Sequence, residues 1–216
     1  MSFEVSSQLY AAYLKRAAEK LRTGKDYITA LDAATGDGDH WANLMTGFDA
    51  ILENLDALRE LPMFQMYQKI GMLMMSKVGG SSGILYGGAY MAAAKALKGK
   101  AVFSSEDLCK SFGYMVQDMM NRGKAEPGFK TMIDALYPAW QAYEKGLAEN
   151  EDDTAILNAV KQATIDGAEA TRGMEAVKGR ASYRTDKAVG YLDAGAVTMS
   201  WQLSCLCDEV LETLSA

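Results

Sequence analysis

Three aspartates and the only histidine of the chain lie close together in one short stretch. The sequence LDAATGDGDHWAN places Asp32, Asp37 and Asp39 in the pattern D-x4-D-x-D, with His40 directly after the last aspartate. Glycines between the aspartates prevent a regular helix and let the backbone fold until the three carboxylates converge. Carboxylates held so close repel one another unless a cation lies between them. The pattern therefore predicts a metal site.

The ligand types favour magnesium as the metal. Oxygen ligands without a cysteine favour Mg²⁺ or Ca²⁺ over zinc, and the calcium-hand loop does not fit, because it would put Trp41 and Phe48 where oxygen ligands belong. Mg²⁺ usually completes its shell with water and substrate phosphates, so a phosphorylated ligand is expected beside it. His40 and Asn43, on the first turn of the next helix, would face that ligand. The alternative is a solvated acidic turn in which Asp39 caps the helix.

A second glycine-rich stretch, KVGGSSGILYGG, has the composition of an anion-binding loop. A Gly-Gly pair and two hydroxyls, Ser81 and Ser82, precede a helix that we expect to begin near Gly83, and free N–H groups at a helix N-terminus bind phosphate. The chain contains no Walker A loop, and GDGDHW lacks the third glycine and the preceding strand of a dinucleotide-binding fingerprint. Any nucleotide must then be held by an all-helical site.

The segments between these loops carry a strong helical signal. They are rich in Ala, Leu, Met, Glu and Lys, and the chain has only three prolines. We expect an all-α bundle of about eight helices, at residues 7–21, 41–58, 63–77, 83–97, 105–121, 130–147, 154–177 and 194–213. The connections ATGDGDHWAN, KVGGSSGILYGG, NRGKAEPGFKTM and KGRASYRTDKAVGYLDAGAV all bear glycine, which suggests that backbone approaches a ligand there. Ordinary helix capping is the alternative for each one alone.

Composition excludes several classes of protein. A chain of 216 residues that is 49% hydrophobic is expected to form a single domain, residues 1–216. The net charge of -6 argues against a nucleic-acid partner. No apolar run is long enough to span a membrane and the N-terminus does not resemble a signal peptide, so we expect a cytoplasmic protein without a membrane partner. Cys109, Cys205 and Cys207 are expected to be buried thiols rather than disulfide or zinc ligands.

Four motifs together resemble a known family. In order along the chain, LDAATGDGDHWANL, VGGSSGILYG, RGKAEPGFKTMIDALYP and KGRASYRTDKAVGYLDAGA are similar to the nucleotide-binding (L) subunit of bacterial dihydroxyacetone kinases, of the phosphoenolpyruvate- and phosphotransferase-dependent type. The resemblance covers about residues 27–200. It implies an antiparallel eight-helix barrel, with loops at one end that hold ADP, and transiently ATP, through two Mg²⁺ ions.

The resemblance also implies roles for particular residues. It assigns the metal ligands to Asp32, Asp37 and Asp39. It assigns the nucleotide contacts, which comprise phosphate-binding positions, pocket residues, a basic residue of a flexible lid and a closing loop, to His40, Asn43, Ser81, Ser82, Gly123, Met132, Arg180, Asp193 and Gly195. No residue is assigned as a catalytic acid or base, and Arg180 is the candidate lid residue.

Three positions depart from the family pattern. Trp41 replaces a usual small residue after the histidine, Phe129 stands where the family often has aspartate before Lys130, and GYLDAGA, which contains Ala194, replaces the commoner G-H-x-D-P-G. None of these changes removes a metal ligand. They could alter the lid, the adenine side of the pocket or the surface that docks a partner.

The implied mechanism needs partner subunits. In the family a histidine of another subunit binds the ketone, whereas the single histidine here, His40, is assigned to phosphate. A phosphotransferase is thus implied in which bound ADP is rephosphorylated in place by a phosphohistidine carrier of the phosphotransferase system. The γ-phosphoryl then passes to dihydroxyacetone, or a similar short ketose, on a separate subunit. The chain could also form a homodimer.

Two other functions are alternatives. The chain could serve a kinase that uses freely exchanging ATP with a separate substrate subunit, in which case ADP would leave quickly. It could instead be a non-enzymatic, nucleotide-loaded regulator, which would bind nucleotide without supporting any transfer. A helical bundle without a ligand is the plainest alternative.

Overall fold

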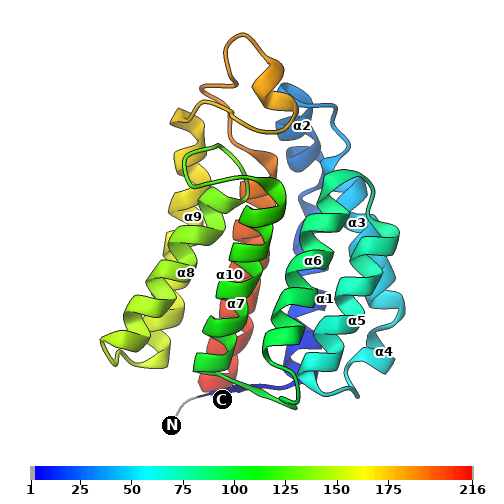
Figure 1. Cartoon of the computed structure of the whole chain (residues 1–216), viewed down its shortest axis with the longest axis vertical. Helices are drawn as coiled ribbons and strands as arrows, with labels where there is room; N and C mark the ends of the chain where they lie inside the picture. The colour runs from blue at the N-terminus through cyan, green and yellow to red at the C-terminus, as the bar shows by residue number, and fades with distance from the viewer. Residues whose placement is uncertain (1–2, 216) are drawn as a thin grey trace.

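The computed structural model describes residues 3–215 and is almost wholly helical (Figure 1). The described residues contain ten α-helices: α1 (Ser7–Thr23), α2 (Lys25–Thr35), α3 (His40–Glu53), α4 (Leu55–Leu58), α5 (Met63–Lys77), α6 (Gly80–Ala96), α7 (Ser105–Gly123), α8 (Ile133–Ala148), α9 (Asp153–Ala170) and α10 (Ala194–Leu214). Two short 3₁₀ helices, η1 (Thr171–Gly173) and η2 (Arg180–Tyr183), lie between α9 and α10, and the two-residue strands β1 (Glu4–Val5) and β2 (Phe103–Ser104) pair antiparallel. The all-α prediction is confirmed.

Eight of the helices form a closed ring. Following the contacts around the molecule, α1 packs on α3, α3 on α5, α5 on α6, and so on through α7, α8 and α9 to α10, which packs back on α1. Their buried apolar faces share one core. The short helix α2 and the connection between α9 and α10 lie together at one end of this barrel (Figure 1). The ring therefore presents its loops at that end as a single rim.

Polar caps fix where several helices begin. The Ser6 hydroxyl accepts a hydrogen bond from the backbone of α1, and Ser104 forms a capping box with Asp107 at the start of α7. Asp152 and Asp193 cap α9 and α10 in the same way, through their carboxylates. Each cap satisfies a backbone N–H that has no partner within its helix.

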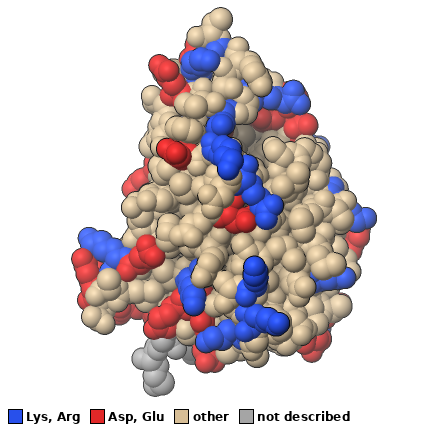
Figure 2. Space-filling model, in the orientation of Figure 1, with Lys and Arg blue, Asp and Glu red and all other residues tan. Residues whose placement is uncertain are grey.

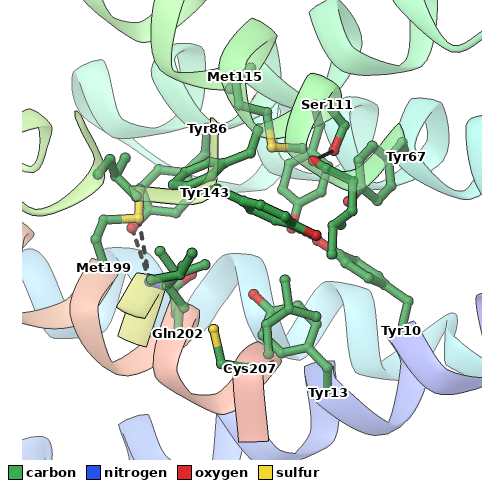
Figure 3. Close-up of a pocket in the computed structure, with 18 of the residues that line it drawn as sticks. Tyr10, Tyr13, Tyr67, Tyr86, Ser111, Met115, Tyr143, Met199, Gln202 and Cys207 are labelled. Carbon is green, nitrogen blue, oxygen red and sulfur yellow. Dashed lines mark hydrogen bonds between the residues drawn. The ribbon is translucent and has the colours of Figure 1, made fainter. Parts of the chain in front are cut away.

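The barrel encloses a small cavity of about 90 Å³ whose lining includes six tyrosines among mostly apolar side chains (Figure 3). The hydroxyls of Tyr10 and Tyr90 lie 2.8 Å apart, and that of Tyr86 accepts a hydrogen bond from the Gln202 amide. Burial raises the pKa of Tyr67 and of Tyr86 to about 12. Their hydroxyls therefore stay protonated near neutral pH, and the cavity lining carries no charge.

The helix boundaries differ from the sequence expectation where side chains bond to the backbone. The helix expected from residue 130 begins at Ile133, because Lys130 adopts a left-handed conformation (φ 59°) and sends its side chain inward. The helix expected to reach residue 177 ends at Ala170, where the Thr171 hydroxyl bonds the Ala168 carbonyl oxygen. The helix expected near residue 83 begins earlier, at Gly80, and the one expected at 41–58 divides at Asn54.

None of the helices in residues 3–215 combines the length and apolar composition needed to cross a membrane. The three cysteines are free and buried, as expected. The strand pair and α2 were not expected. Only Ile28 of α2 is buried, so the helix has no apolar stripe from which its periodicity could be read.

Candidate functional site

A cleft of about 540 Å³ opens at the end of the barrel that carries α2. Its walls come from the loops before α3 and α8, the first turn of α6, the start of α10 and residues 174–192, which we call the cap. All of the residues predicted for the metal and nucleotide sites line this one cleft: Asp32, Asp37, Asp39, His40, Asn43, Ser81, Ser82, Gly123, Met132, Arg180, Asp193 and Gly195. In the space-filling view, basic and acidic side chains are interspersed over this face without a broad patch of one sign (Figure 2).

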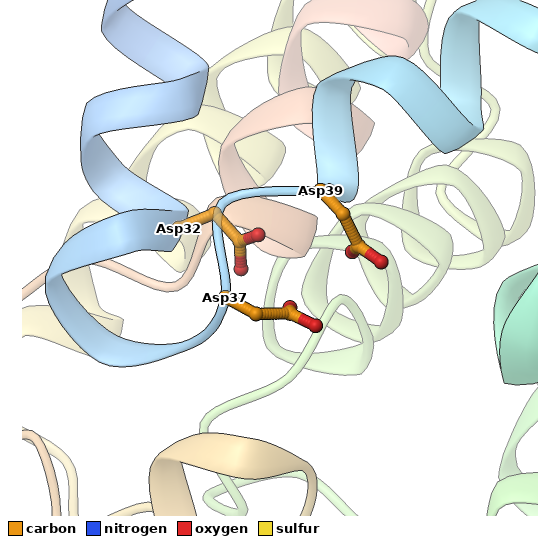
Figure 4. Close-up of side chains that lie close together, drawn as sticks. All are labelled: Asp32, Asp37 and Asp39. Carbon is orange, nitrogen blue, oxygen red and sulfur yellow. The ribbon is translucent and has the colours of Figure 1, made fainter.

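The three aspartates converge at the junction of α2 and α3 (Figure 4). One carboxylate oxygen from each of Asp32, Asp37 and Asp39 lies within 4.8 Å of the others. Two glycines permit the turn: Gly38 has φ 77°, and a Cβ on Gly36 would lie 2.8 Å from the Asp32 Oδ1 atom. The loop is therefore shaped to bring the carboxylates together rather than to spread them.

The carboxylate of Asp39 does not cap α3. It occupies the N-cap position but makes no hydrogen bond to the helix, and the first-turn N–H of His40 donates instead to Asp32 Oδ2 at 3.1 Å. Within residues 3–215, the one ion pair to the cluster comes from the cap, where Arg180 lies 2.6 Å from Asp37. Three convergent oxygen donors without a thiol fit a hard divalent cation such as Mg²⁺.

His40 is fixed against α10. Its Nε2 atom lies 2.9 Å from the Thr198 hydroxyl, which donates to the Gly195 carbonyl oxygen at 3.1 Å. The imidazole and the hydroxyl therefore share a hydrogen bond whose donor is set by the tautomer of the ring. Burial lowers the pKa of His40 although Asp32 and Asp39 oppose the shift. The ring thus links the aspartate loop to the start of α10 as a neutral group.

The serines lie on the first turn of α6 rather than in the loop before it. Gly79 is the N-cap and Gly80 has φ 66°, so the chain enters the helix through a turn that favours glycine. A Cβ on Gly79 would lie 3.3 Å from the Asn43 Oδ1 atom, which brings this turn against α3. Ser81 and Ser82 therefore present hydroxyls and free helix N–H groups to the cleft.

Part of the cleft lining is apolar. Gly123, at the end of α7, and Met132, before α8, lie on it. The other apolar side chains there are Ile84, Leu85, Met119, Ala125 and Ile133. The cleft thus combines acidic and polar groups with apolar side chains, which suits a ligand with a charged group and a flat base.

Asp193 closes the cleft beside the cap. Its Oδ2 atom accepts from the Ala196 N–H at 2.8 Å, and a Cβ on Gly195 would lie 3.1 Å from it. Burial raises the pKa of Asp193 to about 6, with a smaller contribution from the nearby Asp134 and an opposing one from Lys130. The pKa of a carboxylate in this position shifts when a charged group enters the cleft.

Sequence reasoning missed three basic residues in the cleft: Arg122, Lys130 and Lys178. Arg122 pairs with Asp118 at 2.5 Å, and Lys130 is buried, with desolvation lowering its pKa. Each belongs to one of the glycine-bearing stretches, so proximity to those motifs was the available signal. Their positions along the chain do not reveal that they line the same cleft.

The departures from the family pattern lie at different distances from the cleft. The Trp41 indole turns away from it and donates to the Leu21 carbonyl oxygen at 2.8 Å, and Phe129 packs against the core. Ala194, by contrast, is buried in the cleft wall. Two of the three departures therefore lie outside the cleft lining.

Comparison with known proteins agrees with this arrangement. The sequence model of the DAK2 domain matches residues 34–208. The chain is 32% identical over 194 residues to the PEP-dependent dihydroxyacetone kinase, ADP-binding subunit DhaL, of Escherichia coli (strain K12), covering 90% of this chain and 92% of that protein. It is 34% identical over 201 residues to the ADP-binding subunit DhaL of PEP-dependent dihydroxyacetone kinase 2 of Listeria innocua, covering 92% of each.

Solved structures show the same fold. The dihydroxyacetone kinase of C. freundii in its native form superposes with a TM-score of 0.73 at 25% identity, covering 93% of this chain and 34% of that one. The same kinase in complex with AMP-PNP and Mg²⁺ gives a TM-score of 0.69 at 26% identity, over 92% and 33%. The chain thus spans about a third of the length of that kinase.

Proposed function

The chain belongs to the DAK2 domain family, and from that premise we propose that it is the ADP-binding phosphotransferase subunit of a dihydroxyacetone kinase. Residues 1–216 form one nucleotide-binding domain in this proposal. Its strongest support is the convergence of every residue implied by the family resemblance on one cleft. The ADP-binding relatives, which align over nearly their whole length, support it independently.

The nucleotide lies across the cleft in this proposal, with its phosphates toward the aspartates. Two Mg²⁺ ions held by Asp32, Asp37 and Asp39 would neutralise phosphate charge and orient the terminal phosphoryl group. Ser81 and Ser82 contribute hydroxyls and helix N–H groups to the phosphates. The apolar part of the lining near Gly123 and Met132 accommodates the base.

The remaining residues orient the nucleotide and exclude water from it. His40 and Asn43 border the phosphate end, while Asp193 and Gly195 close the cleft from α10. Arg180 brings a positive charge from the cap to the carboxylate cluster. No side chain needs to act as an acid or base within this chain, because phosphoryl transfer depends mainly on positioning and charge neutralisation.

Partner proteins supply the rest of the reaction in this proposal. A phosphohistidine carrier of the phosphotransferase system rephosphorylates the bound ADP, and a separate subunit presents dihydroxyacetone or a similar short ketose. The relatives' names support a kinase that depends on phosphoenolpyruvate and is divided among subunits. A homodimer is not required, because no second copy is needed to complete the cleft.

Reconstitution tests this function. The purified chain is loaded with Mg²⁺ and labelled ADP, freed of unbound nucleotide, and mixed with the phosphorylated carrier and the ketose-binding subunit. We expect labelled ATP to form on the chain and the ketose to be phosphorylated while the label stays bound. Turnover only with excess free ATP would favour an exchanging kinase, and nucleotide binding without any transfer would favour a regulator.

A further inference from the structure

Lys130 is a buried cation that the proposed chemistry does not use. Only 2% of the residue is exposed, and its left-handed backbone directs the side chain beneath the cleft. Its Nζ atom donates to two backbone carbonyl oxygens, that of Thr171 at 2.5 Å and that of Tyr191 at 2.6 Å. Thr171 lies just before the cap, and Tyr191 lies within the cap near its C-terminal end. A single ammonium therefore holds both ends of the cap.

Further bonds join the same two segments. The Asp193 N–H donates to the Thr171 hydroxyl at 3.0 Å, and the Gly190 N–H donates to the Arg172 carbonyl oxygen at 2.8 Å. The Thr171 hydroxyl is itself directed by its bond to Ala168. The end of α9 and the start of α10 are thus joined beneath the cap. Two charged groups donate across this junction: Lys130, and Arg172, whose Nη1 atom donates to the Gly190 carbonyl oxygen at 3.5 Å.

A buried carboxylate fixes the loop that carries Lys130. Asp134, which is 4% exposed, accepts from the Gly128 N–H at 2.5 Å and from the Thr131 N–H at 2.7 Å. The Phe129 carbonyl oxygen accepts from Val177 of the cap at 3.2 Å. The loop is therefore fixed by the Asp134 carboxylate and is joined to the cap by the bond from Val177.

We propose that Lys130 is a positioning residue that anchors both ends of the cap, and through Tyr191 and Thr171 holds Asp193 and Gly195 against the nucleotide. It touches backbone rather than reacting atoms. Removing the ammonium takes one donor from the buried Thr171 carbonyl oxygen, which also accepts from the Met174 N–H at 3.1 Å, and takes the lysine donor from the partly buried Tyr191 carbonyl oxygen. The two ends of the cap thereby lose the charged group that joins them. The part of this inference that concerns nucleotide retention rests on the proposed function, whereas the anchoring of the cap does not.

Limited trypsin digestion of the ligand-free chain tests the anchor directly. The cap contains Lys178, Arg180, Arg184 and Lys187, so trypsin reports on its opening. Mass spectrometry measures the rate of cleavage within residues 174–192. We expect Lys130→Met to raise this rate by roughly tenfold or more, because hydrogen bonds to a charged group no longer hold the cap closed. Lys130→Arg, which keeps a cation with several donors, is expected to lie closer to wild type.

The control is Lys161→Met. Lys161 donates to Asp208 at 2.5 Å between α9 and α10, away from the cleft, so its loss removes a charged hydrogen bond, here a partly exposed one, without touching the cap. Thermal unfolding followed by circular dichroism checks that each variant folds. Cleavage of Lys130→Met at the wild-type rate would overturn the proposal. So would equal acceleration in Lys161→Met, or no protection by Lys130→Arg.

Nucleotide retention gives a second readout. We expect a fluorescent ADP analogue, loaded with Mg²⁺ and chased with unlabelled ADP, to leave Lys130→Met about tenfold faster than wild type or Lys161→Met. An unchanged release rate beside faster cleavage would overturn the link between the cap and the nucleotide. If wild type binds no analogue, the proposed function fails, while the trypsin comparison still decides the anchor.

Discussion

Arg180 of the cap forms an ion pair with Asp37 at 2.6 Å, so a guanidinium from one end of the sequence contacts the carboxylate cluster formed near the other end. The pair joins the segment before α10 to the loop before α3. In the absence of a metal it supplies positive charge to one of three crowded carboxylates. A divalent cation bound by Asp37 must therefore compete with Arg180.

This competition gives the first prediction. Arg180→Gln should raise the affinity of the nucleotide-free chain for Mg²⁺ by about two- to fivefold, the range expected when a largely exposed ion pair no longer competes. Calorimetric titration with MgCl₂ measures it. Arg16→Gln, which breaks an ion pair with Glu209 and Glu212 far from the cleft, is the control. Equal or weaker Mg²⁺ binding by Arg180→Gln would show that the pair does not compete.

A methyl group at residue 36 should disturb the metal site. In Gly36→Ala the new Cβ would lie 2.8 Å from Asp32 Oδ1, so this carboxylate must move, and we expect Mg²⁺ affinity to fall by roughly tenfold. Titration with Mn²⁺ in place of Mg²⁺, followed by electron paramagnetic resonance, measures the metal affinity of the site. Gly173→Ala is the matched control, because a Cβ there meets nothing within 4 Å. Unchanged affinity in Gly36→Ala would argue against Asp32 as a ligand.

Asp193 makes stability depend on pH. Its pKa rises from 3.8 to about 6 on folding, mainly through burial. The neutral form is thus favoured in the folded state, and this contribution is fully present below about pH 4 and lost as pH rises through about 6. Asp193→Asn should therefore raise the melting temperature of the ligand-free chain more at pH 7.5 than at pH 5.

Thermal unfolding at the two pH values checks this difference. Asp152→Asn changes the exposed N-cap of α9, which makes an equivalent bond to the Ala155 N–H at 2.9 Å, and serves as the control for loss of a capping carboxylate. If Asp193→Asn shifts the melting temperature equally at both pH values, Asp193 is not the group responsible.

Trp41 should matter for stability rather than for nucleotide binding. Its indole donates to the Leu21 carbonyl oxygen and packs against the core, while Lys25 lies 4.8 Å from the ring centroid. Trp41→Ala should lower the free energy of unfolding by about 2–4 kcal/mol, as for loss of a large packed aromatic, and change the affinity for Mg-ADP by about twofold or less. Urea denaturation and binding of fluorescent ADP separate the two effects. A large loss of affinity with normal stability would contradict this assignment.

The sequence was most informative where residues that favour helix run without interruption. Helix α5 begins and ends at the expected residues. The all-α class follows from such segments. Helix α2 escaped notice because it lies over the rim and buries a single residue, so tertiary position rather than pattern decides its structure.

The site was predictable to the extent that its residues fall within glycine-bearing loops. The aspartate pattern indicated a metal cluster, but the resemblance was needed to associate residues as distant as Ser81 and Asp193 with the same cleft. Proximity to a glycine-bearing stretch could have marked Lys130 as a cleft residue, but its anchoring role could not be identified from the sequence, because that role comes from two carbonyl oxygens far along the chain. A backbone carbonyl oxygen belongs to every residue type, so no particular amino acid in the sequence marks the acceptor of such a bond.

The most direct test of the central claim is calorimetric titration of the metal- and nucleotide-free chain with ADP, in Mg²⁺ and in EDTA. We expect tight binding in Mg²⁺ that is lost in EDTA, and that weakens by about a hundredfold in Asp37→Asn and in Asp39→Asn, the upper range for loss of a metal-site partner. The control Asp56→Asn, an exposed position on α4, should bind as wild type. No binding in Mg²⁺, or binding that survives both EDTA and loss of the aspartates, would contradict the assignment of the cleft.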